Sequence, residues 1–137
     1  MLRKDAKVEL IRSVPLFSHC SKRELAKIAS LADELDFPES ETLIKEGERG
    51  REFFVLIEGT VDVRQRGRKL APRGRPECFG EIALILDVPR TATVTTTSPV
   101  RALVLTDRAF WGLVGRSPDI QLKLLRSLAQ RLAPETI

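Results

Sequence analysis

Glu81 and Arg90 are the two residues of this chain whose types and spacing point most directly to chemistry. Both lie in the segment CFGEIALILDVPRTATV, residues 78–94. Residues 80–86 are predicted to form two helical turns, and the first N–H groups of a helix have no partner within it. Those N–H groups and the helix dipole attract an anion. Pro89 ends the helix and directs Arg90 back across it, where a guanidinium can complete a phosphate site.

The carboxylate of Glu81 restricts the kinds of ligand that could bind beside Arg90. It would repel a phosphate unless the ligand also presents a hydroxyl group beside the phosphate, as a ribose 2′-OH does. Under this interpretation Glu81 and Arg90 bind two ends of one sugar phosphate. A second interpretation stays open from these residues alone: Glu81 stabilises the helix start through the dipole, and Arg90 is its ion-pair partner or a solvated loop residue.

The composition fits one folded domain with a core of ordinary size, since 42% of the 137 residues are hydrophobic and 31% are charged. The net charge of +4 is compatible with an anionic ligand. The densest basic stretch, residues 64–75, is interpreted as a solvated hairpin and loop, because nucleic-acid binding usually needs a larger basic face or a recognition helix. No direct nucleic-acid partner is therefore expected.

Histidine and cysteine are too few for a metal centre or for familiar catalytic groups. His19 is the only histidine, and with the adjacent Cys20 it offers two ligands, which do not make a metal site. Cys20 and Cys78 are far apart in the sequence, which favours reduced thiols and a cytoplasmic location. There is no signal peptide pattern and no apolar run long enough to cross a bilayer. We therefore expect a binding protein with no metal, not an enzyme.

Hydrophobic periodicity and turn residues predict strands between helices. Ser21 and Glu24 form a capping-box pattern at the start of a helix over residues 22–32. In the turn at residues 46–50, Gly47 and Gly50 are expected to adopt left-handed backbone. Further helices are predicted at 5–14, 107–114 and 119–132, and strands at 35–37, 42–45, 53–57, 60–65, 68–71, 91–97 and 100–105. Leu124, Leu125, Leu128 and Leu132 are expected on one side of the last helix. This order indicates a β-sandwich or jelly roll.

The sequences FGEIAL (79–84) and PRTATV (89–94) resemble the phosphate-binding cassette of the cyclic nucleotide-binding domain family. VPLF (14–17) with SKREL (21–25) is similar to the entry helices of that family, and EGERG (46–50) with FFVLIEGTV (53–61) to its central strands. The resemblance implies a single domain over residues 1–137. An eight-stranded jelly-roll barrel (34–106) would carry the cassette (79–94) between helices (1–33 and 107–134).

The resemblance also implies a role for each cassette residue. Glu81 receives the ribose 2′-OH, Arg90 pairs with the cyclic phosphate, and N–H groups of residues 80–83 hold the phosphate. Thr91 leaves both cAMP and cGMP open as ligands, with no other cofactor. The predicted binding residues of the cassette are Phe79, Gly80, Glu81, Ile82, Ala83, Arg90, Thr91 and Ala92. Val61, Val63 and Leu70 are expected either to contact the base or to be ordinary core.

Some positions depart from the family pattern. The family often has an acidic residue where Arg51 stands, Arg73 occupies a place expected to be apolar, and residues 76–79 differ from the usual turn. The helix at 119–132 corresponds to the family's lid and dimer helix, so a homodimer through it stays open. The resemblance implies a cyclic nucleotide sensor acting on an effector domain in the same or a partner chain. The alternatives are the sensory half of a transcription regulator and a degenerate interaction module.

Overall fold

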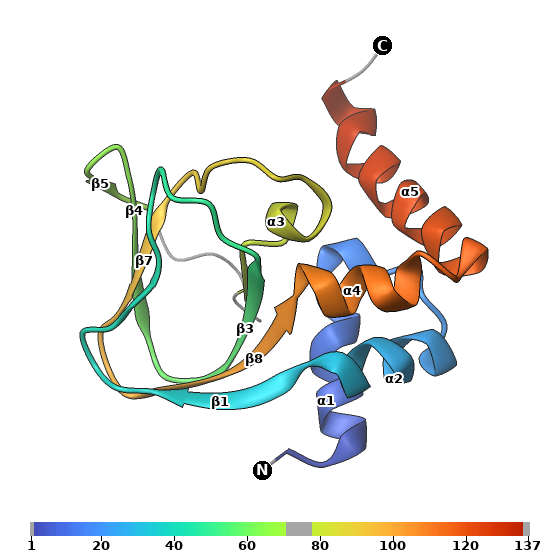
Figure 1. Cartoon of the computed structure of the whole chain (residues 1–137), viewed down its shortest axis with the longest axis horizontal. Helices are drawn as coiled ribbons and strands as arrows, with labels where there is room; N and C mark the ends of the chain where they lie inside the picture. Colours follow the sequence, from blue (N-terminus) through green and yellow to red (C-terminus); the bar gives the residue numbers. More distant parts are fainter. Residues whose placement is uncertain (1, 71–77, 136–137) are drawn as a thin grey trace. The chain divides into compact units, whose positions relative to one another are not determined.

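The computed structural model describes residues 2–70 and 78–135, and the chain divides into two compact units (Figure 1). The helical unit comprises Met1–Ala32 and Arg108–Ile137, and the sheet unit comprises Asp33–Asp107. Predicted features that fall on residues 71–77, among them Arg73, the end of the strand at 68–71 and the following loop, lie outside the described residues.

The helical unit contains short helices joined by tight turns. Its elements are α1 (Lys4–Arg12), the 3-10 turn η1 (Pro15–Phe17), α2 (Lys22–Leu31), α4 (Asp107–Val114, starting at the last residue of the sheet unit), α5 (Pro118–Leu132) and η2 (Ala133–Glu135). The capping box of α2 is confirmed: the Glu24 N–H donates to Ser21 Oγ at 3.2 Å, and the Ser21 N–H donates to Glu24 Oε1 at 2.8 Å. These bonds satisfy two N–H groups that the helix cannot satisfy itself.

An ion pair joins α2 to α5 within the helical unit. Lys123 Nζ donates to the Glu24 carboxylate, which also accepts the bond from Ser21. Burial by itself would raise the pKa of the Glu24 carboxyl, but the hydrogen bonds from Lys123 and Ser21 hold it below its ordinary value. The pair therefore favours the charged carboxylate in the folded state.

The four leucines of α5 lie on one side of the helix, as their spacing predicts, but only part of that side is buried. Leu124 is 6% exposed, whereas Leu125 is 63% exposed and Leu132 is 60% exposed. Successive residues of a helix are rotated by about 100°, so Leu124 and Leu125 lie at the two edges of the leucine side, and only the edge at Leu124 is buried. No helix among the described residues has the length and apolar character that crossing a membrane requires.

The sheet unit consists of two four-stranded antiparallel sheets (Figure 1). One has the order β1-β8-β3-β6, and the other has the order β2-β7-β4-β5. The strands are β1 (Asp33–Phe37), β2 (Thr42–Ile44), β3 (Glu52–Glu58), β4 (Val61–Gln65), β5 (Arg68–Lys69), β6 (Cys78–Phe79), β7 (Thr93–Thr96) and β8 (Val100–Thr106). The mainly β fold with flanking helices is confirmed, while closure of the sheets into a barrel stays a prediction.

A shared apolar core holds the two sheets together. Phe54 and Ala102 contribute to it from the first sheet, and Ile44 and Val94 contribute from the second. Alternate residues of a strand point to opposite faces, so one face of each sheet supplies this core. The burial of large apolar side chains here fixes which strand faces turn inward.

Two local predictions in the sheet unit are wrong. Helix α3 is a single turn, Ile82–Ile85: Gly80 has a φ of +86°, which is incompatible with a right-handed helix at that residue, and the backbone becomes extended at Leu86. In the turn at residues 46–50, Gly47 has a φ of +86° as expected, but Gly50 does not adopt left-handed backbone. The glycine at position 50 therefore needs another explanation.

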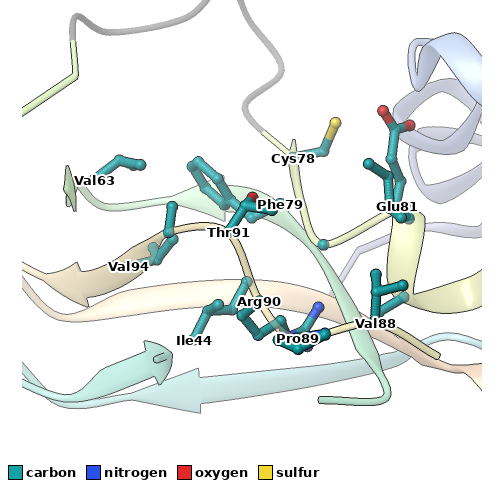
Figure 2. Close-up of a pocket in the computed structure, with 14 residues that line it drawn as sticks. Ile44, Val63, Cys78, Phe79, Glu81, Val88, Pro89, Arg90, Thr91 and Val94 are labelled. Atoms are coloured by element: carbon teal, nitrogen blue, oxygen red, sulfur yellow. The ribbon is translucent and has the colours of Figure 1, made fainter. Parts of the chain in front are cut away.

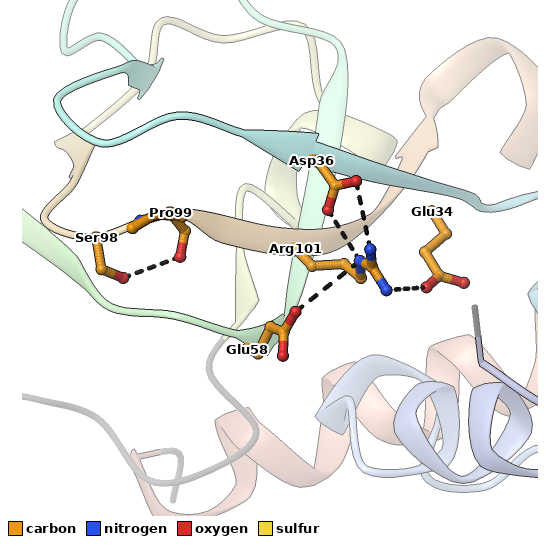
Figure 3. A network of polar contacts seen from close by, with 6 residues as sticks. All are labelled: Glu34, Asp36, Glu58, Ser98, Pro99 and Arg101. Atoms are coloured by element: carbon orange, nitrogen blue, oxygen red, sulfur yellow. Dashed lines mark hydrogen bonds and ion pairs between the residues drawn. The ribbon is translucent and has the colours of Figure 1, made fainter.

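Arg101 on β8 ties three strands of the first sheet together (Figure 3). Its Nε lies 2.8 Å from Asp36 Oδ1 on β1 and 4.0 Å from Glu58 Oε1 on β3, and its Nη1 lies 3.6 Å from Glu34 Oε1. The hydrogen bond from Arg101 holds the pKa of the Asp36 carboxyl below its ordinary value. The register places Asp36 and Glu58 beside Arg101, so the strand pairing itself brings these charges together.

Candidate ligand-binding site

A pocket of about 210 Å³ opens beside α3 in the sheet unit (Figure 2). Ligand pockets commonly measure about 300–1,000 Å³, so a ligand of nucleotide size would extend beyond this one. The predicted residues that line the pocket are Phe79, Gly80, Glu81, Ile82, Ala83, Arg90, Thr91, Ala92 and Val63. Ile44, Cys78, Val88, Pro89 and Val94 line it as well.

Val61 and Leu70, two of the three residues expected either to contact the base or to be ordinary core, are not among the residues that line the pocket. Val61 packs against the core cluster between the sheets and does not line the pocket. Leu70 is half-buried after β5, where its N–H donates to the Val63 carbonyl at 2.8 Å. Val63 contacts both the core and the pocket, while contact of Val61 and Leu70 with a base stays a prediction.

Arg90 is a buried cation with an incomplete set of hydrogen bonds. Only 8% of the residue is exposed. Its Nη2 donates to the Glu52 carbonyl at 2.7 Å, while the buried Nη1 has no hydrogen-bond partner among the described residues. Burial lowers the pKa of the guanidinium, and Glu52 opposes that shift; arginine nevertheless stays protonated in proteins. The arrangement leaves a buried positive donor that an anion can satisfy.

The turn at residues 46–50 holds the backbone of Arg90 in place. The Arg90 N–H donates to the Glu48 carbonyl, and the Gly47 N–H donates to the Arg90 carbonyl, both at 2.9 Å. Beside them Arg49 Nη1 lies 2.9 Å from Asp87 Oδ1. Sequence reasoning missed the carbonyls of Glu48 and Glu52, since a backbone contact leaves no mark on residue type. The charged residues of the turn at 46–50 gave no indication of these backbone contacts either.

Glu81 is not the ion-pair partner of Arg90. Arg90 Nη2 is bonded to a carbonyl and its Nη1 to nothing among the described residues. In Figure 2 the Glu81 carboxylate points away from the Arg90 guanidinium. Glu81 is the N-cap residue of α3, but its side chain makes no capping hydrogen bond. The interpretation of the two residues as partners of each other is thereby excluded, and each can meet a different part of a ligand.

The start of α3 offers fewer N–H donors than predicted. The Ala83 N–H donates to the Gly80 carbonyl at 3.1 Å, so a ligand would have to compete for it. Gly80 is required for two reasons. Its φ of +86° favours glycine, and a Cβ there would lie 2.5 Å from Arg90 Nη1 and 2.9 Å from the Glu52 carbonyl oxygen. The backbone at Gly80 therefore lies directly against the guanidinium.

The remaining polar groups do not build a metal site. Among the described residues no group of three or more histidine, cysteine or acidic side chains could hold a metal ion. His19 Nε2 lies 2.7 Å from Gln130 Oε1, and neither Cys20 nor Cys78 forms a disulfide within the described part of the chain. The pocket combines an apolar wall, formed by Val63, Val94 and Ile44, with the charges of Arg90 and Glu81.

A comparison with known proteins decides the family. Residues 34–117 match the family model described as "Cyclic nucleotide-binding domain", which covers both sheets and the pocket. The chain belongs to the cyclic nucleotide-binding domain family. The resemblance seen in the cassette is thereby confirmed at the level of the family.

Relatives of this cyclic nucleotide-binding domain occur in proteins of different kinds. It is 36% identical over 116 residues to a cAMP-dependent protein kinase regulatory subunit of Mycosarcoma maydis, covering 78% of this chain and 22% of the relative. It is 31% identical over 129 residues to a CRP-like cAMP-activated global transcriptional regulator of Mycobacterium tuberculosis (strain ATCC 25618 / H37Rv), covering 90% of this chain and 58% of the relative. The chain thus spans less than two thirds of the length of either relative.

Solved structures agree on the fold. The N-terminal domain of a transcriptional regulator from Streptomyces coelicolor A3(2) superposes with a TM-score of 0.83 at 30% identity, covering 93% of this chain and 94% of that one. A structure described as cAMP-bound PfPKA-R (141-441) superposes with a TM-score of 0.69 at 24% identity, covering 96% of this chain and 46% of that one. At that lower identity the second likeness concerns the fold alone.

Proposed function

We propose that this domain binds a cyclic nucleotide, cAMP or cGMP, in the pocket beside α3, and that Arg90 pairs with the cyclic phosphate. The observation that supports the proposal most strongly is the buried Nη1 of Arg90, which lacks a partner among the described residues and lines the pocket. A phosphate oxygen would supply that partner with a charge-assisted hydrogen bond. A degenerate domain would have no reason to keep such a costly group.

The other lining residues fit the rest of the nucleotide. Glu81 is proposed to accept the ribose 2′-OH, while Phe79, Gly80, Ile82, Ala83 and Ala92 border the sugar phosphate. Val63 contributes to the apolar wall against which a base can rest. Thr91 is exposed at the rim, where its hydroxyl can meet either a phosphate oxygen or the amino group of guanine. Its position is compatible with both cAMP and cGMP.

Isothermal titration calorimetry with cAMP and cGMP tests the ligand. Replacing Arg90 by Ala should weaken binding about 10-fold to 150-fold, because a hydrogen bond to a charged group contributes about 1.5–3 kcal/mol. Arg64→Ala is the matched control, since Arg64 is exposed on β4 and does not line the pocket. Equal affinities of the wild type and Arg90→Ala would contradict the proposed role of Arg90.

We infer that the domain is regulatory, and that occupancy of the pocket is passed to an effector domain in the same chain or in a partner. The relatives are a kinase regulatory subunit and a transcription regulator, so both kinds of effector are candidates. The sensory half of a transcription regulator gains support from the Streptomyces domain, which matches at 30% identity over 94% of its length. No catalytic activity of its own, no nucleic-acid contact and a cytoplasmic location stay predictions.

A homodimer through α5 is part of the proposal. Leu122, Leu125 and Leu132 are 48%, 63% and 60% exposed, and their spacing puts them on one stripe of the helix. The stripe is short for a coiled coil, so association should be weak and depend on concentration. Light scattering during gel filtration should show a dimer at high concentration that Leu125→Glu abolishes. A monomer at every concentration would contradict this part of the proposal.

A further inference from the structure

Gly50 lies against the guanidinium of Arg90, and backbone conformation does not explain the glycine. Its φ is outside the left-handed region that favours glycine. A Cβ built at position 50 would lie 2.2 Å from Arg90 Nε, 2.5 Å from Nη2 and 2.6 Å from Cζ. A side chain at this position would therefore occupy the place that the guanidinium now fills.

We propose that Gly50 is a positioning residue for the bound nucleotide, because the absence of its side chain admits the Arg90 guanidinium. The space it leaves lets Nη2 reach the Glu52 carbonyl at 2.7 Å and leaves Nη1 for the ligand. Gly80 meets the same guanidinium from a second loop, since a Cβ there would lie 2.5 Å from Nη1. The inference rests on the proposed function, in which Arg90 pairs with the cyclic phosphate.

Gly50 and Gly80 differ in what a methyl group would displace. At position 50 the three nearest atoms all belong to the end of the Arg90 side chain, which can rotate away. At position 80 the methyl group would also meet the Glu52 carbonyl, and the φ of +86° would be strained. Gly50→Ala should therefore move the guanidinium with little effect on folding, whereas Gly80→Ala should destabilise the fold as well.

A double-mutant cycle separates an effect through Arg90 from a general one. We would measure cAMP affinity by calorimetry for the wild type, Gly50→Ala, Arg90→Ala and the double variant. Gly50→Ala should weaken binding about tenfold or more, because it displaces a charge-assisted contact. In the Arg90→Ala background the same change should leave the affinity unaltered. Gly112→Ala, on α4 with no atom near its built Cβ, is the control that should bind as the wild type does.

Each outcome bears on one proposal. If the wild type binds neither cAMP nor cGMP, the proposed function fails; if it binds and Gly50→Ala binds equally well, only the role of Gly50 is overturned. An equal loss in both backgrounds also overturns it, since Gly50 would then act without Arg90. Should Gly50→Ala fail to fold, thermal melting decides: removing the guanidinium in the double variant must restore folding, and a double variant that stays unfolded overturns the inference.

Discussion

Arg90 is a buried charge that the sheet unit balances only in part. One terminal nitrogen meets the dipole of the Glu52 carbonyl, and the other has no partner among the described residues. Position 51, where the family often has an acidic residue, carries Arg51, which adds positive charge instead. A buried donor without a partner raises the free energy of the folded domain. An anion that accepts its hydrogen bond removes this cost. Because the ligand-free domain carries this cost, its free energy changes when an anion occupies the site.

Glu81 can be tested through the group that it is proposed to bind. Glu81→Gln should weaken cAMP binding about tenfold, since a neutral acceptor replaces a charged one for the ribose 2′-OH. The same variant should bind 2′-deoxy-cAMP as well as the wild type does, because that ligand lacks the hydroxyl group. Calorimetry with both ligands on both proteins measures the coupling free energy between the Glu81 carboxylate and the ribose 2′-OH. Equal losses for the two ligands would contradict the assignment.

At the scale of helices and strands, the sequence predicted those elements whose formation depends on the types of their side chains. A continuous apolar run predicted β3, alternating apolar residues predicted β4, and Ser21 with Glu24 predicted the start of α2. The errors fell where backbone geometry decides: α3 is shorter, with Gly80 left-handed and the backbone extended at Leu86, and Gly50 serves side-chain packing instead of a turn. The cassette likewise predicted Arg90 and Glu81, but not the carbonyl of Glu52, because any residue type can supply a carbonyl.

The turn between β3 and β4 depends on Gly59. Its φ is +98°, and a Cβ there would lie 2.4 Å from the Pro99 carbonyl oxygen. Gly59→Ala therefore combines backbone strain with a clash against backbone that cannot rotate away, and should cost about 3 kcal/mol or more in unfolding free energy. Gly67→Ala, with a φ of +77° but no atom near its built Cβ, should cost only about 1 kcal/mol. Urea denaturation measures both; equal costs would refute the clash.

At the scale of the whole molecule, groups in both units make stability depend on pH. The pKa of Glu24 lies below its ordinary value of 4.5 because hydrogen bonds from Lys123 and Ser21 outweigh its burial. The pKa of Asp36 lies below 3.8 because of Arg101. Groups with lowered folded pKa values stabilise the fold above their ordinary values, and this contribution is lost as the pH falls through the folded ones. Acid should therefore weaken the helical and the sheet unit alike.

Ionisation of the Cys20 thiol limits the stability of the fold at alkaline pH. Burial, and then the nearby Glu24 carboxylate, raise the pKa of its thiol from 9.0 to about 11. In the unfolded chain the thiol ionises near its ordinary pKa, while in the folded chain it stays neutral. Unfolding is thus favoured increasingly as the pH rises from about 9 to about 11. The fold should be most stable between this range and the acid range of Glu24 and Asp36.

Two variants separate the acid limb from the alkaline limb, which are the losses of unfolding free energy at low and at high pH. Cys20→Ser should flatten the loss of stability between pH 9 and 11, because a serine hydroxyl does not ionise there, and should leave the acid limb unchanged. Glu24→Gln should act on the acid limb: it should lower the unfolding free energy at pH 7, and its difference from the wild type should shrink as the pH falls below 4.5 and through the lowered folded pKa of Glu24. Urea denaturation at each pH gives these curves. An alkaline limb that Cys20→Ser leaves as steep as before would mean that another group ionises on unfolding, and that the thiol of Cys20 is not the source.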